Sequence, residues 1–230
     1  MTIERRRNLL ASSSEPLEIV DFGAGSGHRF DTGDAETTNV TVRTLGDMTG
    51  SSKPMRWAYL LFRLVRELRP ASVVELGACV GISAAYQAAA LELNGEGRLI
   101  TLEGAPALAA QATASLAALG LEHRAVVVEG RFVDTLDGVL AERRPIGLAF
   151  VDGHHVESAT LDYKERILAA AADEAVLVFD DIHWSPGMTR AWHAIAPDPR
   201  FALTLDLRSL GIAVVSASAT VRASAAMSYG

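Results

Sequence analysis

The stretch Ser72-Val-Val-Glu-Leu-Gly-Ala-Cys-Val-Gly-Ile-Ser83 decides the fold. Its β-branched start predicts a strand that ends in Glu75 and a glycine turn, and a helical pattern follows at once over residues 84–91. A strand, a glycine loop and a helix in this order are typical of a nucleotide-binding α/β sheet. In this interpretation Gly77 permits a tight turn, and Gly81 permits a ligand to approach the backbone near the free N–H groups of the helix.

A second acid supports this interpretation. Glu103 closes the next strand pattern, over residues 98–103. A carboxylate at that position can accept hydrogen bonds from both hydroxyls of a ribose, as the acid after the second strand does in dinucleotide sites. The glycine loop and Glu103 together therefore predict a site for a cofactor that contains a ribose.

Helical and strand patterns alternate from residue 54 to residue 216. Such alternation predicts a mostly parallel sheet with helices on both faces. Only residues 207–211 separate the last two strand patterns, so we expect an antiparallel hairpin at the sheet edge. The predicted strands are 72–76, 98–103, 125–129, 146–152, 175–180, 201–206 and 211–216, and the predicted helices are 54–68, 82–93, 105–119, 132–143, 157–172 and 186–196.

Composition excludes several classes of protein. The 230 residues suffice for one α/β domain, and no apolar run is long enough to span a bilayer. The net charge of −7, with no basic cluster beyond Arg5-Arg6-Arg7, argues against nucleic acid as a partner. A single cysteine, Cys79, fits a reducing compartment, and the N-terminus has no signal-peptide pattern. We therefore expect a cytoplasmic protein whose partner is a small molecule.

The glycine loop, written E-x-G-x-x-x-G, resembles motif I of the class I S-adenosylmethionine-dependent methyltransferases. Glu103 resembles the acid of motif II, and the stretches 150–155 and 178–187 resemble the fourth and fifth strand ends of small-molecule O-methyltransferases. The resemblance covers residues 54–216. It implies a Rossmann-like class I methyltransferase fold with a seven-stranded sheet, S-adenosylmethionine as the cofactor, and methyl transfer to a hydroxyl of a small molecule.

The resemblance also implies the residues of the cofactor site. Glu75 would orient the amino group of the cofactor, the loop backbone would contact its methionine part, and Glu103 would hold the ribose. Ser83, at the start of the helix, is typical of a helix cap as well. The full set of expected cofactor-binding residues is Glu75, Gly77, Ala78, Gly81, Ser83, Glu103, Gly104, Glu129, Gly130 and Asp152.

A second group of residues lies at the predicted fourth and fifth strand ends. In catechol-type O-methyltransferases, acids at these positions hold Mg²⁺, which lowers the pKa of the substrate hydroxyl. The expected metal ligands are Asp152, Asp180 and Asp181, although that family usually has asparagine where Asp181 stands. In a metal-free alternative, His154 or His155 is the general base and a carboxylate such as Asp152 orients its ring. These residues could also have no catalytic role.

The ends of the chain carry weaker patterns. Residues 18–27 also read like motif I, but no helical pattern follows Gly27, so this copy cannot form the same cofactor cradle. We expect residues 1–53 to form an N-terminal extension that caps the substrate side or contacts a partner subunit. Together with the apolar helix at 54–68, this extension suggests a homodimer or a lid. Residues 217–230 are expected to form a loosely packed tail.

Two other functions share parts of this pattern. A nicotinamide-dependent oxidoreductase would use the same strand, glycine loop, helix and acid, but the wider glycine spacing and the missing Tyr-x-x-x-Lys set argue against it. A non-catalytic methyltransferase-like binding protein is the other alternative. The complete set of Glu75, Gly77, Gly81 and Glu103 favours a working enzyme.

Overall fold

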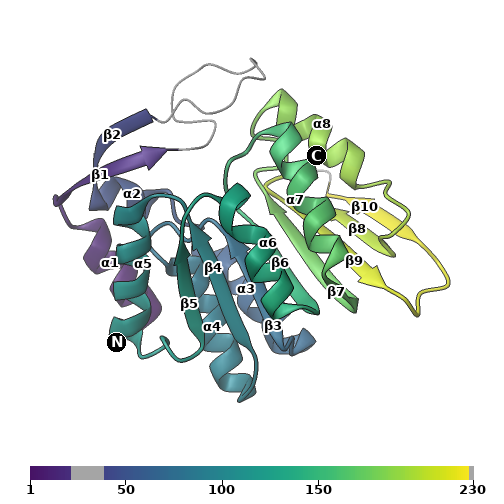
Figure 1. Cartoon of the computed structure of the whole chain (residues 1–230), viewed down its shortest axis with the longest axis horizontal. Coiled ribbons are helices and arrows are strands. Elements are labelled where there is room, and N and C mark those ends of the chain that lie inside the picture. Colours follow the sequence, from purple (N-terminus) through teal and green to yellow (C-terminus); the bar gives the residue numbers. More distant parts are fainter. Residues whose placement is uncertain (22–38, 228–230) are drawn as a thin grey trace.

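Eight strands form the central sheet of the computed structural model, which describes residues 1–21 and 39–227 (Figure 1). Their order across the sheet is β10-β8-β9-β7-β6-β3-β4-β5. Within this sheet β9 alone runs antiparallel to its neighbours, β7 and β8, which confirms the predicted hairpin. The strands are β3 (Ser72–Leu76), β4 (Arg98–Glu103), β5 (Ala125–Glu129), β6 (Ile146–Val151), β7 (Ala171–Asp180), β8 (Leu203–Asp206), β9 (Leu210–Ser216) and β10 (Ala223–Ala226).

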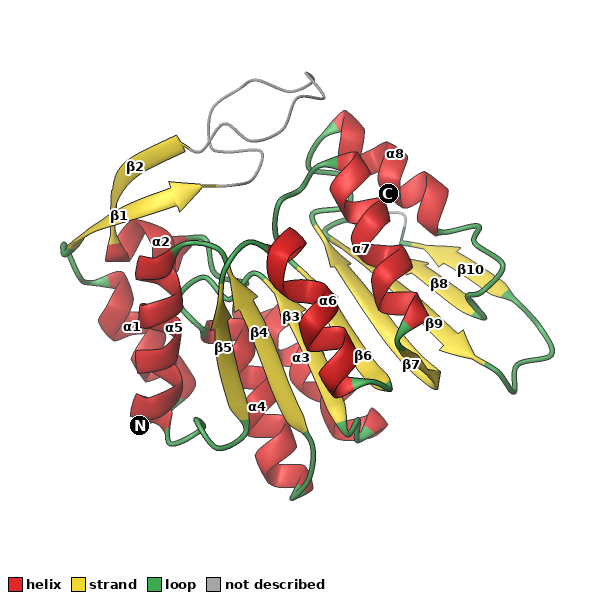
Figure 2. Ribbon diagram, viewed as in Figure 1, coloured by secondary structure: helices red, strands yellow, loops and turns green. Residues whose placement is uncertain are grey.

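Helices cover both faces of this sheet (Figure 2). Because side chains alternate along a strand, Val73 of β3 packs in one core cluster with α3, α4 and α5, whereas Val74 packs in another with α6, α7 and α8. The predicted layered α/β architecture is therefore confirmed. These helices are α3 (Met55–Leu68), α4 (Ile82–Asn94), α5 (Pro106–Leu119), α6 (Phe132–Arg143), α7 (Glu157–Ala169) and α8 (Pro186–Ile195).

The N-terminal segment forms a unit of its own beside the sheet. It contains α1 (Ile3–Ala11), the antiparallel pair β1 (Pro16–Asp21) and β2 (Asn39–Thr44), and α2 (Leu45–Gly50). Residues 18–21, the first part of the stretch at 18–27 that also reads like motif I, thus belong to a separate two-stranded sheet. Residues 22–27 of that stretch lie outside the described residues.

This N-terminal segment packs against the glycine loop. Leu10, Ile19 and Leu45 share a buried cluster with Val80 and Ile82, which flank Gly81. The segment therefore lies next to the expected cofactor cradle. The apolar face of α3 is used within the chain, because Leu61 and Val65 are fully buried in the core. The homodimer stays a prediction.

The C-terminal tail differs from its expected loose packing. Ala223–Ala226 form the edge strand β10, which pairs in parallel with β8. The side chains of these four residues are small and exposed, so they produce no apolar alternation that the sequence could reveal. Backbone hydrogen bonds to β8 define this strand, together with one side-chain hydrogen bond of 3.1 Å that the hydroxyl of Thr204 donates to Oγ of Ser224. Among the described residues, no helix has the length and apolar character needed to cross a membrane.

Candidate functional site

The carboxyl ends of β7, β6, β3 and β4 lie side by side at one edge of the sheet. The chain reverses its direction of strand addition here, since β4 lies on one side of β3 and β6 on the other. Ligands of open α/β sheets bind at such a switch point. Each of the four strand ends carries an acid: Asp180, Asp152, Glu75 and Glu103.

The glycine loop after β3 needs glycine at two positions. Gly77 has a φ of +102°, and a Cβ added there would overlap the carbonyl oxygen of Asp152. Gly81 has a φ of +84°, and its added Cβ would come within 2.9 Å of Cα of Ala112 in α5. Glycine is therefore required at position 81 by close packing against α5, and not only by the approach of a ligand.

Glu75 lies at the bottom of this loop and is fully buried. Its Oε1 accepts a hydrogen bond of 2.8 Å from Nε2 of Gln87, whereas its Oε2 is buried without a hydrogen-bond partner among the described residues. Burial raises the pKa of Glu75 to about 7. A cationic group placed at Oε2 would favour the ionised form, which fits the expected contact with the amino group of a cofactor.

A Glu75→Gln variant should therefore be more stable than the wild type at alkaline pH. Between its unfolded pKa of about 4.3 and its folded pKa of about 7, Glu75 binds more protons in the folded state, so the free energy of unfolding falls as pH rises. We expect the variant to gain about 3 kcal/mol at pH 8 and nothing at pH 4. Urea unfolding across this range measures the difference, with Glu67→Gln on the exposed face of α3 as the control. A gain that does not depend on pH would contradict the assignment.

Glu103 is held by the glycine loop at the edge of the sheet where the carboxyl ends of the strands lie, called the rim below. Its Oε2 accepts a 2.8 Å hydrogen bond from the backbone N–H of Cys79, and its Oε1 accepts one of 3.0 Å from the N–H of Ala105. The carboxylate is thereby held beside the glycine loop. Burial and the charge of Glu103 raise the pKa of the Cys79 thiol to about 12, so this thiol stays protonated and unreactive.

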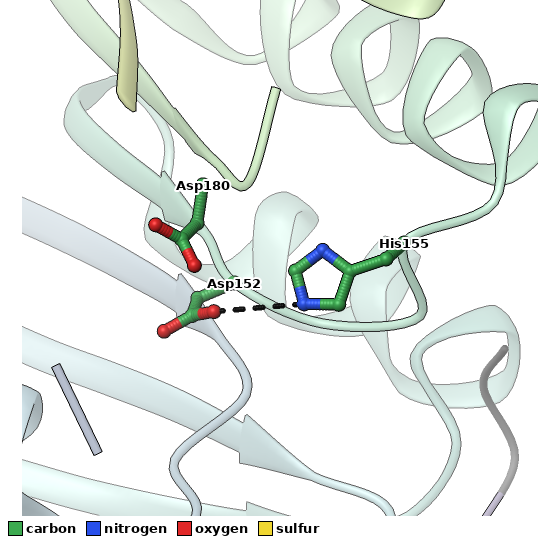
Figure 3. A group of neighbouring side chains, drawn as sticks. All are labelled: Asp152, His155 and Asp180. Carbon is green, nitrogen blue, oxygen red and sulfur yellow. Dashed lines mark ion pairs between the residues drawn. The ribbon is translucent and has the colours of Figure 1, made fainter. Parts of the chain in front are cut away.

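Asp152 and Asp180 face each other at the ends of β6 and β7 (Figure 3). The ammonium of Lys53 contacts both: Nζ forms an ion pair with Oδ2 of Asp180 and lies 3.6 Å from Oδ1 of Asp152. Lys53 comes from the segment between α2 and α3, far from the two acids in sequence. No sequence motif marks Lys53 as a functional residue, although it is one of only two lysines in the chain.

Lys53, Asp152 and Asp180 shift one another's pKa values. Burial alone would lower the pKa of Lys53, but the charges of Asp152 and Asp180 outweigh it and raise this pKa above its ordinary value. Burial, followed by the repulsion between the two acids, raises the pKa of Asp180 well above its usual range. Burial also raises the pKa of Asp152, against the opposing effect of Lys53. Lys53 is therefore a permanent cation in contact with a buried acid pair.

The two expected histidines have different surroundings. Nε2 of His155 lies 3.7 Å from Oδ1 of Asp152, so this ring faces the acid pair (Figure 3). Burial lowers the pKa of His155, which keeps the imidazole neutral and able to accept a proton. His154 instead lies 2.8 Å, Nδ1 to hydroxyl oxygen, from Tyr163. The geometry thus favours His155 over His154 as a base.

Residues 74–182 match the model of a methyltransferase domain family. This part of the chain is therefore similar to a methyltransferase domain. The matched range contains the glycine loop, Glu103, both histidines and both buried acids of the rim. No curated protein sequence matches the chain.

Solved structures of methyltransferases share the fold of this chain. An O-methyltransferase from Bacillus cereus, in complex with S-adenosylhomocysteine, is 21% identical with a TM-score of 0.62, over 74% of this chain and 84% of that one. The O-methyltransferase TomG from Streptomyces achromogenes, in complex with S-adenosylmethionine, is 22% identical with a TM-score of 0.61, over 72% and 82%. At these identities the likeness establishes the fold.

The remaining residues of the predicted cofactor site lie around the glycine loop. The N-cap of α4 is Gly81 and no side chain caps this helix, so the interpretation of Ser83 as a cap is wrong. Ser83 is buried in the first turn instead. Gly130 donates its backbone N–H to the carbonyl of Glu103 at 2.9 Å, which joins the ends of β5 and β4, and Glu129 beside it is exposed. The binding roles of Ala78, Gly104, Glu129 and Gly130 stay predictions.

The metal prediction meets a mixed environment. Ligand atoms of Asp152, His155 and Asp180 all lie within 4.8 Å of one another, and two carboxylates with an imidazole suit a divalent cation. Asp181, the third expected ligand, follows Asp180 in a left-handed conformation and donates its N–H to the carbonyl of Ser209. The ammonium of Lys53, however, already contacts both acids. The ligand types therefore suit a divalent metal ion, but the ammonium of Lys53 occupies the space beside Asp152 and Asp180.

Proposed function

We propose that this chain transfers the methyl group of S-adenosylmethionine to a hydroxyl of a small molecule. The observation that carries the proposal is the arrangement of Glu75, the Gly77–Gly81 loop and Glu103 around one switch point of the sheet. The methyltransferase family match supports it, and so do the solved neighbours that hold S-adenosylmethionine or S-adenosylhomocysteine.

The cofactor would lie across the ends of β3 and β4. Its amino group would meet the unpaired oxygen of Glu75, and its ribose hydroxyls would meet the carboxylate of Glu103. The free N–H groups at the start of α4 would face the carboxylate of its methionine part, because a helix N-terminus attracts negative charge. Its sulfonium would then point toward the ends of β6 and β7, where Asp152 and Asp180 lie.

The acceptor would bind on the side of His155. Trp184, which is 45% exposed and lies with its ring centroid 5.8 Å from that of His155, would border it. His155 takes the proton of the acceptor hydroxyl as the oxygen attacks the methyl carbon. The O–C bond forms while the C–S bond breaks, and its electron pair stays on sulfur to give S-adenosylhomocysteine. Such a displacement depends mainly on alignment.

A divalent metal held by Asp152, Asp180 and Asp181 would be the other way to activate the hydroxyl. Displacement of Lys53 from its two ion pairs would have to come first. No step of the proposed reaction passes through a metal.

Calorimetric titration with S-adenosylhomocysteine tests the proposal. We expect binding near micromolar, about −8 kcal/mol, for the wild type. A Glu103→Gln variant should bind about 1–3 kcal/mol more weakly, because it loses charge-assisted hydrogen bonds to the ribose. Glu92→Gln, an exposed acid paired with Arg124 on the protein surface, is the matched control and should bind like the wild type.

Two outcomes would redirect the assignment. Binding of reduced nicotinamide adenine dinucleotide without any binding of S-adenosylhomocysteine would favour the oxidoreductase alternative. Tight binding of S-adenosylhomocysteine that is equal in the wild type and Glu103→Gln would keep the function and remove the ribose assignment.

A further inference from the structure

The ammonium of Lys53 lies in contact with the two carboxylates that a metal ion would need. We propose that Lys53 supplies the positive charge for the acceptor oxygen at this rim, in place of a divalent metal ion. The proposal rests on the proposed function for the identity of the reaction. Its structural part, a protein cation that excludes a metal from the acid pair, stands on the geometry alone.

Space is the first argument. Nζ of Lys53 forms an ion pair with Asp180 and lies 3.6 Å from Asp152, and both acid side chains are largely buried. A divalent ion bound to the same carboxylates would lie about 2.0–2.6 Å from their oxygens. That position overlaps the ammonium, so the metal and Lys53 cannot occupy the acid pair together.

The local structure holds Lys53 in this place. A capping box between Thr44 and Asp47 fixes the start of α2, and the hydroxyl of Thr49 donates to the carbonyl of Leu45 at 2.7 Å. The carbonyl of Met48 contacts Sγ of Cys79 at 3.4 Å, which ties the segment to the glycine loop. Directly after Lys53, Pro54 is the N-cap of α3. Lys53 therefore lies between two anchored helices.

The number of donors on an ammonium leaves one for a substrate. Lysine has three N–H donors, and two of them suffice for Asp152 and Asp180. The third can donate to the acceptor oxygen. As the hydroxyl proton moves to Nε2 of His155, the charge of Lys53 stabilises the negative charge that develops on this oxygen. The oxygen then attacks the methyl carbon, and the C–S bond breaks with its electron pair on sulfur.

Titration of the protein with Mn²⁺ tests whether Lys53 excludes a metal ion from the acid pair. Electron paramagnetic resonance measures the concentration of free Mn²⁺ at each step of the titration. The wild type should show no binding tighter than about 1 mM. A Lys53→Met variant frees the two carboxylates and His155, so its affinity for Mn²⁺ should rise by about tenfold or more. A Lys53→Met/Asp180→Asn double variant should lose that gain, because one of the freed carboxylates is gone.

Lys164→Met is the matched control, because Lys164 is the other lysine and also lies between two acids, Glu165 and Asp198. Its removal should create no Mn²⁺ site, since Arg200 still pairs with both of these acids. Circular dichroism shows whether each variant is folded. If Lys53→Met does not fold, the wild-type titration decides the matter.

Wild-type binding of Mn²⁺ well below 1 mM, with the same affinity in Lys53→Met, would overturn the proposal. Loss of turnover in EDTA and its return with a divalent metal would also overturn it. Titration of the same wild-type sample with S-adenosylhomocysteine separates the two hypotheses. Absence of cofactor binding refutes the proposed function, whereas the Mn²⁺ result reports on Lys53 in either case.

Discussion

An Asp180→Asn variant is expected to turn over at least about a hundredfold more slowly than the wild type, with an affinity for S-adenosylhomocysteine within about twofold. Asparagine keeps the shape of this buried side chain but removes the charge that holds Lys53. Without it, the ammonium keeps only its longer contact with Asp152, at 3.6 Å. Steady-state kinetics and calorimetry on the same preparation measure the two quantities.

Asp198→Asn is the matched control for this experiment. Asp198 is also a largely buried acid and pairs with Lys164 at 2.8 Å, between α7 and the end of α8. Its replacement should lower the melting temperature and leave turnover unchanged. Normal turnover in Asp180→Asn would mean that the acid pair is structural, and would leave His155 as the main candidate for activating the hydroxyl.

The second large effect concerns folding. A Gly77→Ala variant is expected to lose about 4 kcal/mol or more of unfolding free energy, or to fail to fold. The added Cβ would overlap the carbonyl oxygen of Asp152, which is backbone of the adjacent chain segment and cannot rotate away. The loop after β3 would have to move away from β6, and the cradle would open. Urea unfolding monitored by circular dichroism measures the loss.

Gly120→Ala separates the clash from the cost of the backbone conformation. Gly120 also has a positive φ, +70°, but an added Cβ would meet no atom within 4 Å. This variant should lose only about 1–2 kcal/mol, the ordinary cost of a left-handed conformation. Equal losses in the two variants would show that the contact with Asp152 does not matter.

The sheet and the rim could be predicted because their signals are local. The strand before Gly77 follows from its β-branched run, and the helix after Gly81 follows from the helical pattern that begins directly after the glycine loop. Because parallel strands bring their carboxyl ends to one edge, the sequence alone predicts that Glu103 and Asp152 lie near the glycine loop. The short segment at 207–211 likewise indicated the antiparallel strand.

Other features depend on contacts between distant segments. Lys53 stands in a Ser-Ser-Lys-Pro stretch with no motif, and only tertiary packing brings it to Asp180. The strand β10 is defined mainly by backbone pairing, which its small exposed side chains do not reveal in the sequence. For Gly81, the helix that its Cβ would meet begins more than twenty residues later. The expected cap at Ser83 failed because the glycine in a left-handed conformation itself starts α4.

Lys53 precedes the stretch that matches the methyltransferase family, whereas the acids it contacts lie within that stretch. The residues of the cradle and the proposed cation therefore lie on separate pieces of the chain. An exchange of the segment ahead of α3 would replace the cation and leave the sheet, the loop and Glu103 intact. Evolution of such a fold can thus change how a hydroxyl is activated without rebuilding how the methyl donor is held.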